Sequence, residues 1–141
     1  MAIDNIVDDF EFLDDWEDRY RYIIELGRSL EPYPEEDRDD LHKVRGCVSQ
    51  VWLSTRVETD DSGTQILHFK GDSDAHIVRG LVAIMIAFYT GRTASEIANQ
   101  EATDLLLRLG LNEHLTPQRS NGLNSLVVRM RKEAENALLA A

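Results

Sequence analysis

With 141 residues, the chain has the length for one domain that buries a core of its own. Hydrophobic residues make up 43% and charged residues 29%, a globular composition that excludes disorder of the whole chain. No apolar stretch reaches the ~18 residues of a membrane span, and the N-terminus lacks the pattern of a secretory signal. We therefore expect a single domain over residues 1–141, located in the cytoplasm.

The negative charge is concentrated at one end of the sequence. The net charge is −11; residues 1–40 hold 15 acidic and four basic residues, whereas residues 41–141 hold 11 of each. This distribution argues against nucleic-acid binding and against docking on anionic membranes, since both require a basic surface. The acidic segment is either a solvated, solubilising face or an electrostatic handle for a basic partner.

The first third of the chain predicts two helices followed by an irregular turn. Apolar residues recur at helical spacing over 4–13, and Asp15 can then cap a second helix through its side-chain oxygen. Pro32 and Pro34 end this region, because proline cannot continue a helix. The charge-dense stretch 35–40 is expected to form a loop.

The middle of the chain predicts a β-hairpin and a buried helix. Alternation with β-branched residues over 48–58 indicates a strand, 59–63 has turn residues, and 65–70 reads as the returning strand. The stretch 71–74 is expected to form a turn whose Asp72 or Ser73 caps the next helix. That helix, 77–88, is apolar on nearly every side and should lie at the centre of the core, with Gly80 allowing close approach of a neighbour.

The remainder of the chain predicts further helices. A capping box begins at Thr93, residues 102–109 suggest a short helix, and Thr116 followed by Pro117 marks the start of a long amphipathic helix. The predicted fold class is α+β, a small antiparallel β-sheet covered by helices on one face.

The only cysteine, Cys47, is the first candidate for chemistry. It follows Gly46 in a loop, and Lys43 and Arg45 just upstream are expected to lower its pKa and favour the nucleophilic thiolate. The alternative is a buried cysteine that serves only in packing. A cysteine hydrolase would need a histidine base, and a metal site would need three or four ligands at tight spacing. The sequence shows neither pattern, so we expect no metal.

Two acidic residues and one arginine are further candidates. Asp72 and Asp74 lie before the predicted buried helix, where capping and the helix dipole would account for both. Arg119 stands at a helix N-terminus, which is unfavourable for a cation and suggests a specific partner. Asp72 or Asp74 could be that partner through a charge-assisted hydrogen bond.

Three segments together resemble one family, the SufE sulfur-acceptor proteins. Residues 46–52 (Gly-Cys-Val-Ser-Gln-Val-Trp) are similar to the family's Gly-Cys-x-Ser-x-Val-Trp signature, and residues 71–81 and 115–123 are similar to its second and third blocks. Residues 16–27 also fit the family's second helix. The resemblance covers about residues 10–130 in matching order.

The resemblance implies a function. Proteins of this family accept sulfane sulfur from a pyridoxal phosphate-dependent cysteine desulfurase of the SufS type, hold it as a persulfide on the signature cysteine, and pass it to a SufB-type iron–sulfur scaffold complex. Cys47 would carry the sulfur, and Gly46, Ser49, Asp72, Asp74 and Arg119 would shape its loop or contact the partner. The protein would thus be a carrier and desulfurase activator, with no cofactor of its own.

The family also implies an α+β fold like that of IscU-type scaffold proteins, and a weak homodimer. With one cysteine, this chain should carry sulfur without assembling a cluster. A paralogous acceptor, CsdE, serves a different desulfurase, and Ser49 slightly favours the SufE form. The rival hypothesis from another class is a non-catalytic interaction module, in which Cys47 is a packing residue and the acidic segment binds a basic partner.

Overall fold

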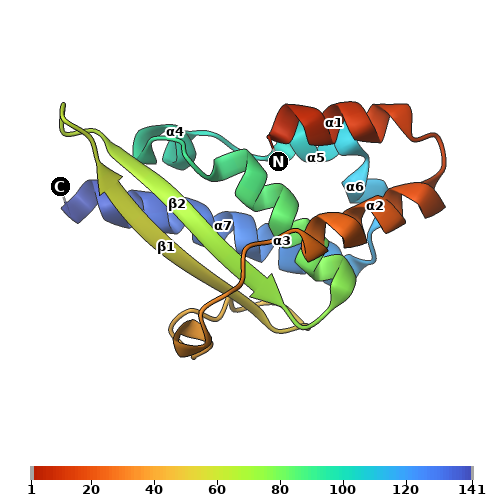
Figure 1. The fold of residues 1–141 in the computed structure, drawn as a ribbon, viewed down its shortest axis with the longest axis horizontal. Helices are drawn as coiled ribbons and strands as arrows, with labels where there is room; N and C mark the ends of the chain where they lie inside the picture. Colours follow the sequence, from red (N-terminus) through yellow and green to blue (C-terminus); the bar gives the residue numbers. More distant parts are fainter. Residues whose placement is uncertain (1, 141) are drawn as a thin grey trace.

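The computed structural model describes residues 2–140, in which helices gather on one side of an antiparallel hairpin (Figure 1). The predicted α+β class is confirmed. In chain order the elements are α1 (Ile3–Phe12), α2 (Trp16–Arg28), the 3-10 turn η1 (Glu35–Asp37), β1 (Val51–Thr59), β2 (Gln65–Ser73), α3 (His76–Tyr89), α4 (Ala94–Asn99), α5 (Thr103–Leu109), α6 (Leu111–His114) and α7 (Pro117–Ala140).

The hairpin is longer at its base than the sequence predicts. β2 continues to Ser73, which pairs with Val51, so the turn predicted over 71–74 is wrong for its first three residues. Gly71 makes this extension possible: a Cβ at this position would lie only 2.7 Å from Val82 Cγ1. A strand without a side chain here can therefore pack directly on α3.

The predicted cap of α3 is also wrong. The N-cap position is Ala75, and no side chain caps the helix there. Asp72 lies on β2, one residue before its end, and its carboxylate bonds to arginines instead. Asp72 and Ser73 have the short polar side chains typical of a helix cap, but in this protein they are the last two residues of β2.

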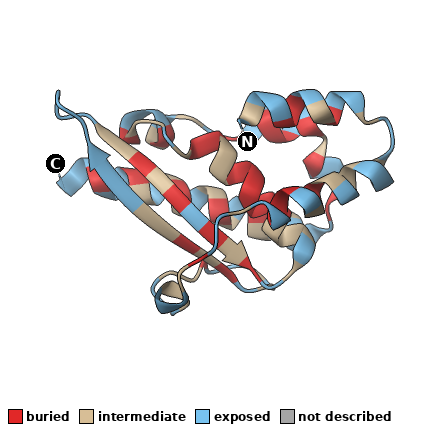
Figure 2. Cartoon of the chain, in the orientation of Figure 1, coloured by how far each residue is buried: buried red, intermediate tan, exposed pale blue. Residues whose placement is uncertain are grey.

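Helix α3 forms the centre of the core, as predicted (Figure 2). The side chains of Ile84 and Met85 are fully buried. The close approach predicted at Gly80 is confirmed, because a Cβ there would lie 2.1 Å from the carbonyl oxygen of Ile23 on α2. A Cβ on Gly27 would in turn lie 2.8 Å from the Gly80 nitrogen, so the two helices cross at backbone distance.

Three other predicted helix caps are confirmed, because their side chains accept hydrogen bonds from backbone N–H groups of the first turn. The distances are 3.0, 3.1 and 3.3 Å for Asp15, Thr93 and Thr116 respectively. Helix α6 was not predicted. It is separated from α5 by Gly110, whose φ of +70° ends one helix and starts the next.

Replacing Gly80 with Ala should destabilise the protein, because the added methyl group would force α2 and α3 apart. We expect a loss of roughly 3 kcal/mol in the free energy of unfolding, measured by urea denaturation. Gly122→Ala is the matched control, since a Cβ there would meet Cys47 Sγ at an ordinary 3.4 Å. A Gly80→Ala variant as stable as the control would contradict the close crossing.

Candidate functional site

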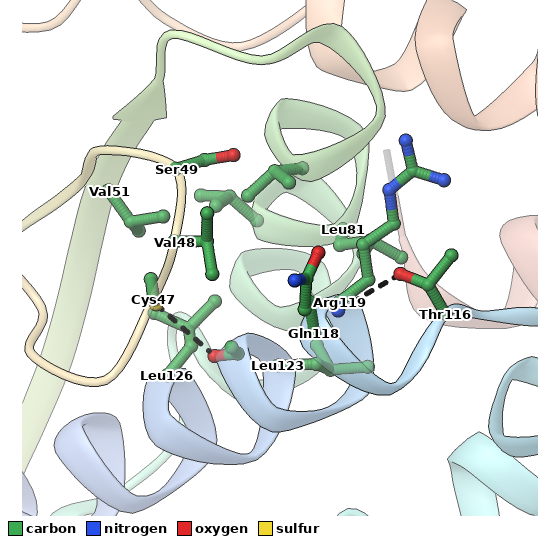
Figure 3. A pocket seen from close by; sticks show the side chains of 13 residues that line it. Cys47, Val48, Ser49, Val51, Leu81, Thr116, Gln118, Arg119, Leu123 and Leu126 are labelled. Carbon is green, nitrogen blue, oxygen red and sulfur yellow. Dashed lines mark hydrogen bonds between the residues drawn. The ribbon is translucent and has the colours of Figure 1, made fainter.

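A cavity of about 220 Å³ lies where the loop before β1 meets the first turns of α3 and α7 (Figure 3). Its wall is mostly aliphatic, with Val51, Val78, Leu81, Val82, Leu123 and Leu126. Polar side chains from the loop and from the start of α7 complete the lining, namely Ser49, Thr116, Gln118 and Arg119. The cavity is therefore apolar on the inside and polar toward its α7 end.

Cys47 lines this cavity from the loop and is half-buried. Its Sγ–H donates a long hydrogen bond of 3.5 Å to the carbonyl oxygen of Gly122 on α7. A Cβ on Gly122 would lie 3.4 Å from the sulfur, an ordinary contact distance, so the thiol lies directly against this turn of α7. The acceptor is a neutral carbonyl, which bonds the protonated thiol and not the thiolate.

Burial raises the pKa of the Cys47 thiol above its ordinary value. The expectation that Lys43 and Arg45 lower this pKa is wrong for the loop as it stands. Arg45 is exposed, and burial is the cause that governs the thiol. In this arrangement Cys47 is held as a neutral, weakly nucleophilic thiol.

The loop is held on both sides of the cysteine. Gly46 has a φ of +89°, a left-handed conformation that favours glycine, and a Cβ on it would lie 2.5 Å from Ser125 Oγ. On the other side, the Gln50 N–H donates to Asp74 Oδ1 at 3.0 Å, and the Asp74 N–H donates to the Gln50 carbonyl at 3.3 Å. Asp74 thus fastens the end of the cysteine loop to the junction of β2 and α3.

Asp72 has a different position from Asp74. It accepts a hydrogen bond from Arg38 Nη2 at 2.6 Å, and Arg79 Nε lies 2.8 Å from its other oxygen. Burial raises the pKa of the Asp72 carboxyl, but the hydrogen bonds from Arg38 and the Ser73 N–H, with the charges of Arg79 and Arg38, outweigh it, and the net pKa is lowered. Arg38 also covers the Trp52 ring, 4.9 Å from its centroid.

This geometry corrects the hypothesis that Arg119 pairs with Asp72 or Asp74. Asp72 is taken by Arg38 and Arg79, and Asp74 by the Gln50 backbone. Arg119 is exposed on the first turn of α7, where its side chain lines the cavity, and no carboxylate within residues 2–140 forms an ion pair with it. It is a cation at the rim of the cysteine cavity, available to a partner.

Sequence reasoning missed three contributors to the site. Arg38 lies in the acidic segment, and no local pattern connects it to Asp72, 34 residues away. Arg79 and Gly122 both lie inside segments that resemble family blocks, but spacing alone did not assign them a role. Arg38 and Gly122 act on residues far away in the sequence, whereas Arg79 reaches back from α3 to Asp72 on the preceding strand.

Three further features are absent from the described residues. Over residues 2–140, no group of three or more His, Cys, Asp or Glu side chains could hold a metal ion. No histidine lines the cavity in this part of the chain. No helix over the same residues is long and apolar enough to cross a membrane.

Comparison with known proteins gives a consistent result. The sequence model of a family described as the SufE Fe-S metabolism associated domain matches residues 4–134. An uncharacterized SufE-like protein of Rhizobium meliloti (strain 1021) is 54% identical over 139 residues, 99% of each chain. Another, of Rhizobium etli, is 57% identical over 134 residues, 95% of this chain and 90% of the relative.

A similar fold has been solved. The solution structure of a hypothetical protein from Thermus thermophilus matches with a TM-score of 0.75 and 19% identity, over 99% of each chain. At this identity the likeness supports the fold alone.

Replacing Asp74 with Ala should release the cysteine loop. Loss of the hydrogen bond from the Gln50 N–H, worth about 1 kcal/mol net, should increase the population of loop conformations that expose Cys47 roughly fivefold. Cys47 should therefore react about fivefold faster with iodoacetamide at neutral pH. Because burial raises the thiol pKa, the pH profile of this reaction should also shift toward lower pH.

The reaction is specific, since Cys47 is the only cysteine. Asp61→Ala, at the exposed hairpin turn, removes the same charge without touching the loop and serves as the control. Equal alkylation rates in Asp74→Ala and Asp61→Ala would show that Asp74 does not restrain the loop.

Proposed function

The chain belongs to the SufE family, and from this membership and the position of Cys47 we propose that it carries sulfur for iron–sulfur cluster assembly. The proposed donor is the persulfide of a cysteine desulfurase of the SufS type, whose pyridoxal phosphate stays on that enzyme. The proposed recipient is a SufB-type scaffold complex. The observation that supports this most directly is the position of the sole cysteine, on a loop that lines an apolar cavity.

The transfer step requires one nucleophile from this chain. The Cys47 thiolate attacks the outer sulfur of the donor persulfide, a new S–S bond forms, and the donor's own S–S bond breaks. The donor cysteine leaves as a thiolate, so the sulfane sulfur changes carrier with no net oxidation or reduction. No metal or acid–base triad is needed, and no second cysteine is present to displace the sulfur.

The resting position of Cys47 opposes this step. A thiol bonded to the Gly122 carbonyl and buried among aliphatic side chains stays protonated. Moving the loop away from α7 removes the burial that raises the pKa, and the thiolate becomes accessible. We propose that docking on the desulfurase extracts the loop, so that the nucleophile forms only in the partner's active site.

The surface around the loop suits such docking. Leu41 and Val48 are 82% and 78% exposed, and they flank Cys47 in the sequence. We propose that the partner covers these two apolar side chains when it docks. Gly46 and Ser49 shape the loop, and Asp74 holds its end. Asp72 ties the end of β2 to Arg38 and Arg79, and Arg119 is the proposed contact to the anionic persulfide or to the partner.

Loading of Cys47 can be measured by mass spectrometry of the intact protein. After incubation with a SufS-type desulfurase, pyridoxal phosphate and cysteine without reductant, the mass should rise by about 32 Da, one sulfur atom. Cys47→Ser should show no gain and should no longer stimulate the desulfurase, while circular dichroism shows that it remains folded.

If the mass does not rise although the desulfurase is active, the proposed carrier function is wrong. In that case binding to a basic partner that survives Cys47→Ser and weakens with salt would favour the interaction-module hypothesis. Running the same assay with a desulfurase of the CsdE-linked type tests which partner is served.

Arg119→Ala should slow loading, because a cation near the incoming persulfide stabilises its negative charge. A lost charge-assisted hydrogen bond predicts a roughly tenfold lower rate. Lys132→Ala is the control, since Lys132 is exposed on the same helix and its loss changes the net charge equally. Equal loading rates in the two variants would show that Arg119 has no role in sulfur transfer.

A further inference from the structure

A second cavity, the β2 groove, lies where the edge of β2 meets α3 and the segment that leaves α2 (Figure 1). Its volume is about 620 Å³, and its wall is mostly aliphatic, with Ile6, Leu26, Leu30, Ala83, Ile86 and Ala87. Apolar cavities of roughly 300–1,000 Å³ are typical of small-molecule sites. Over residues 2–140 no residue lines both the β2 groove and the cysteine cavity, so the two are separate.

Backbone groups of β2 are left unpaired in this groove. Alternate residues of an antiparallel strand direct their N–H and C=O to opposite edges, and Leu67, Phe69 and Gly71 direct theirs away from β1. Leu67 exchanges hydrogen bonds of 3.1 and 2.8 Å with residues 91–92, and the Phe69 N–H donates to Thr90 Oγ1 at 3.0 Å. The Phe69 carbonyl and the Gly71 N–H, which follow along the same edge, have no hydrogen-bond partner in the described part of the chain.

These two groups are the pair by which a strand binds one residue of a parallel neighbour. In a parallel ladder the neighbouring residue donates its N–H to one carbonyl and accepts, on its own C=O, from the N–H two residues further along. Phe69 and Gly71 have this spacing. Residues 90–92 already cover the edge before them, so the groove offers room for one paired residue and not for a long strand.

The mouth of the groove carries positive charge that no close carboxylate balances. Arg56 is exposed and forms no ion pair within residues 2–140. The ion pair of Lys70 is a 3.7 Å contact with Glu31, whose side chain is 76% exposed. The other charged side chains of the lining, His68 and Asp37, are hydrogen-bonded to neighbours. Lys70 and Arg56 are therefore the cations available to a bound anion.

We propose that the β2 groove binds an N-acyl amino acid, in which an apolar acyl chain is joined through an amide to an amino acid with a free carboxylate. The amide N–H donates to the Phe69 carbonyl, and the carboxylate accepts from the Gly71 N–H close to the Lys70 ammonium group. The acyl chain covers the aliphatic wall. The ligand thus pairs with β2 as a parallel strand of one residue.

Each part of this ligand meets a group that the fold leaves without a partner. A simple fatty acid would leave the Phe69 carbonyl unpaired, because it has no N–H to donate. An apolar amine would place a cation beside Lys70 and Arg56. The proposal does not rest on the sulfur-carrier function, since the β2 groove has its own lining.

Titration of the full chain with N-octanoylglycine, followed by proton–nitrogen correlation NMR, tests the proposal. The amide signal of Gly71 should shift and saturate with a Kd of about 0.1 mM, a reasonable affinity for a ligand of this size. N-acetylglycine keeps the polar groups but lacks the chain. It should bind too weakly to measure, because each buried CH₂ contributes about fourfold in affinity.

Two further ligands test the polar contacts. N-octanoylsarcosine has the same chain and carboxylate but a methyl group in place of the amide hydrogen, and it should bind about tenfold more weakly. The methyl ester of N-octanoylglycine removes the negative charge and should lose a similar factor.

Variants of the chain test the location. Ala87→Leu should abolish binding by filling the groove, with Ala140→Leu, at an exposed position of α7, as the matched control. Lys70→Gln should weaken binding about fivefold, whereas Lys132→Gln, an equal change of charge on an exposed residue, should leave it unchanged. Circular dichroism confirms that each variant is folded.

The proposal is overturned if the Gly71 signal does not move at millimolar N-octanoylglycine, or if the shifts are confined to the cysteine cavity. Equal binding of N-octanoylsarcosine would exclude the amide contact and with it this class of ligand. A folded Ala87→Leu variant that binds like wild type, or equal affinities in Lys70→Gln and Lys132→Gln, would place the ligand elsewhere.

Discussion

The position of the cysteine loop depends on how tightly α3 fits between α2 and the hairpin. On one side Gly80 brings the α3 backbone against the Ile23 carbonyl, and on the other Gly71 lets β2 pack against Val82. A Cβ on Gly80 would collide with the α2 backbone and one on Gly71 with the Val82 side chain, and either collision would cost packing stability. The start of α3 is therefore fixed against the end of β2, and the cysteine site is built on that junction.

Two carboxylates at this junction, those of Asp72 and Asp74, bind different parts of the structure. Asp72 points to the arginines, where Arg38 joins the acidic N-terminal segment to the sheet and Arg79 joins it to α3. Asp74 points to the backbone of the cysteine loop. The family-like Gly-Asp-Ser-Asp block thus contains one residue that ties the framework together and one that holds the cysteine loop, which explains how two acids so close in sequence serve separate purposes.

The sequence predicted what depends on local chemistry. Caps such as Thr93 and the apolar run of α3 were correct, because capping and helical periodicity act within a few residues. The predicted turn at Gly71 and the pairing of Arg119 were wrong, because a strand end and an ion pair are decided by elements far apart in the chain. Cys47 itself was found from its motif, whereas its contact with Gly122 needed the packing of α7 against the loop.

Burial and nearby positive charge have opposite effects on the pKa of the Cys47 thiol. Lys43 and Arg45 would favour the thiolate in water, but removal from water penalises the charged sulfur directly. Burial dominates for the loop as it lies in the structure, against the cavity wall. Reactivity is therefore coupled to burial: a loop position that returned the thiol to water would remove the penalty on the charged sulfur and favour the thiolate.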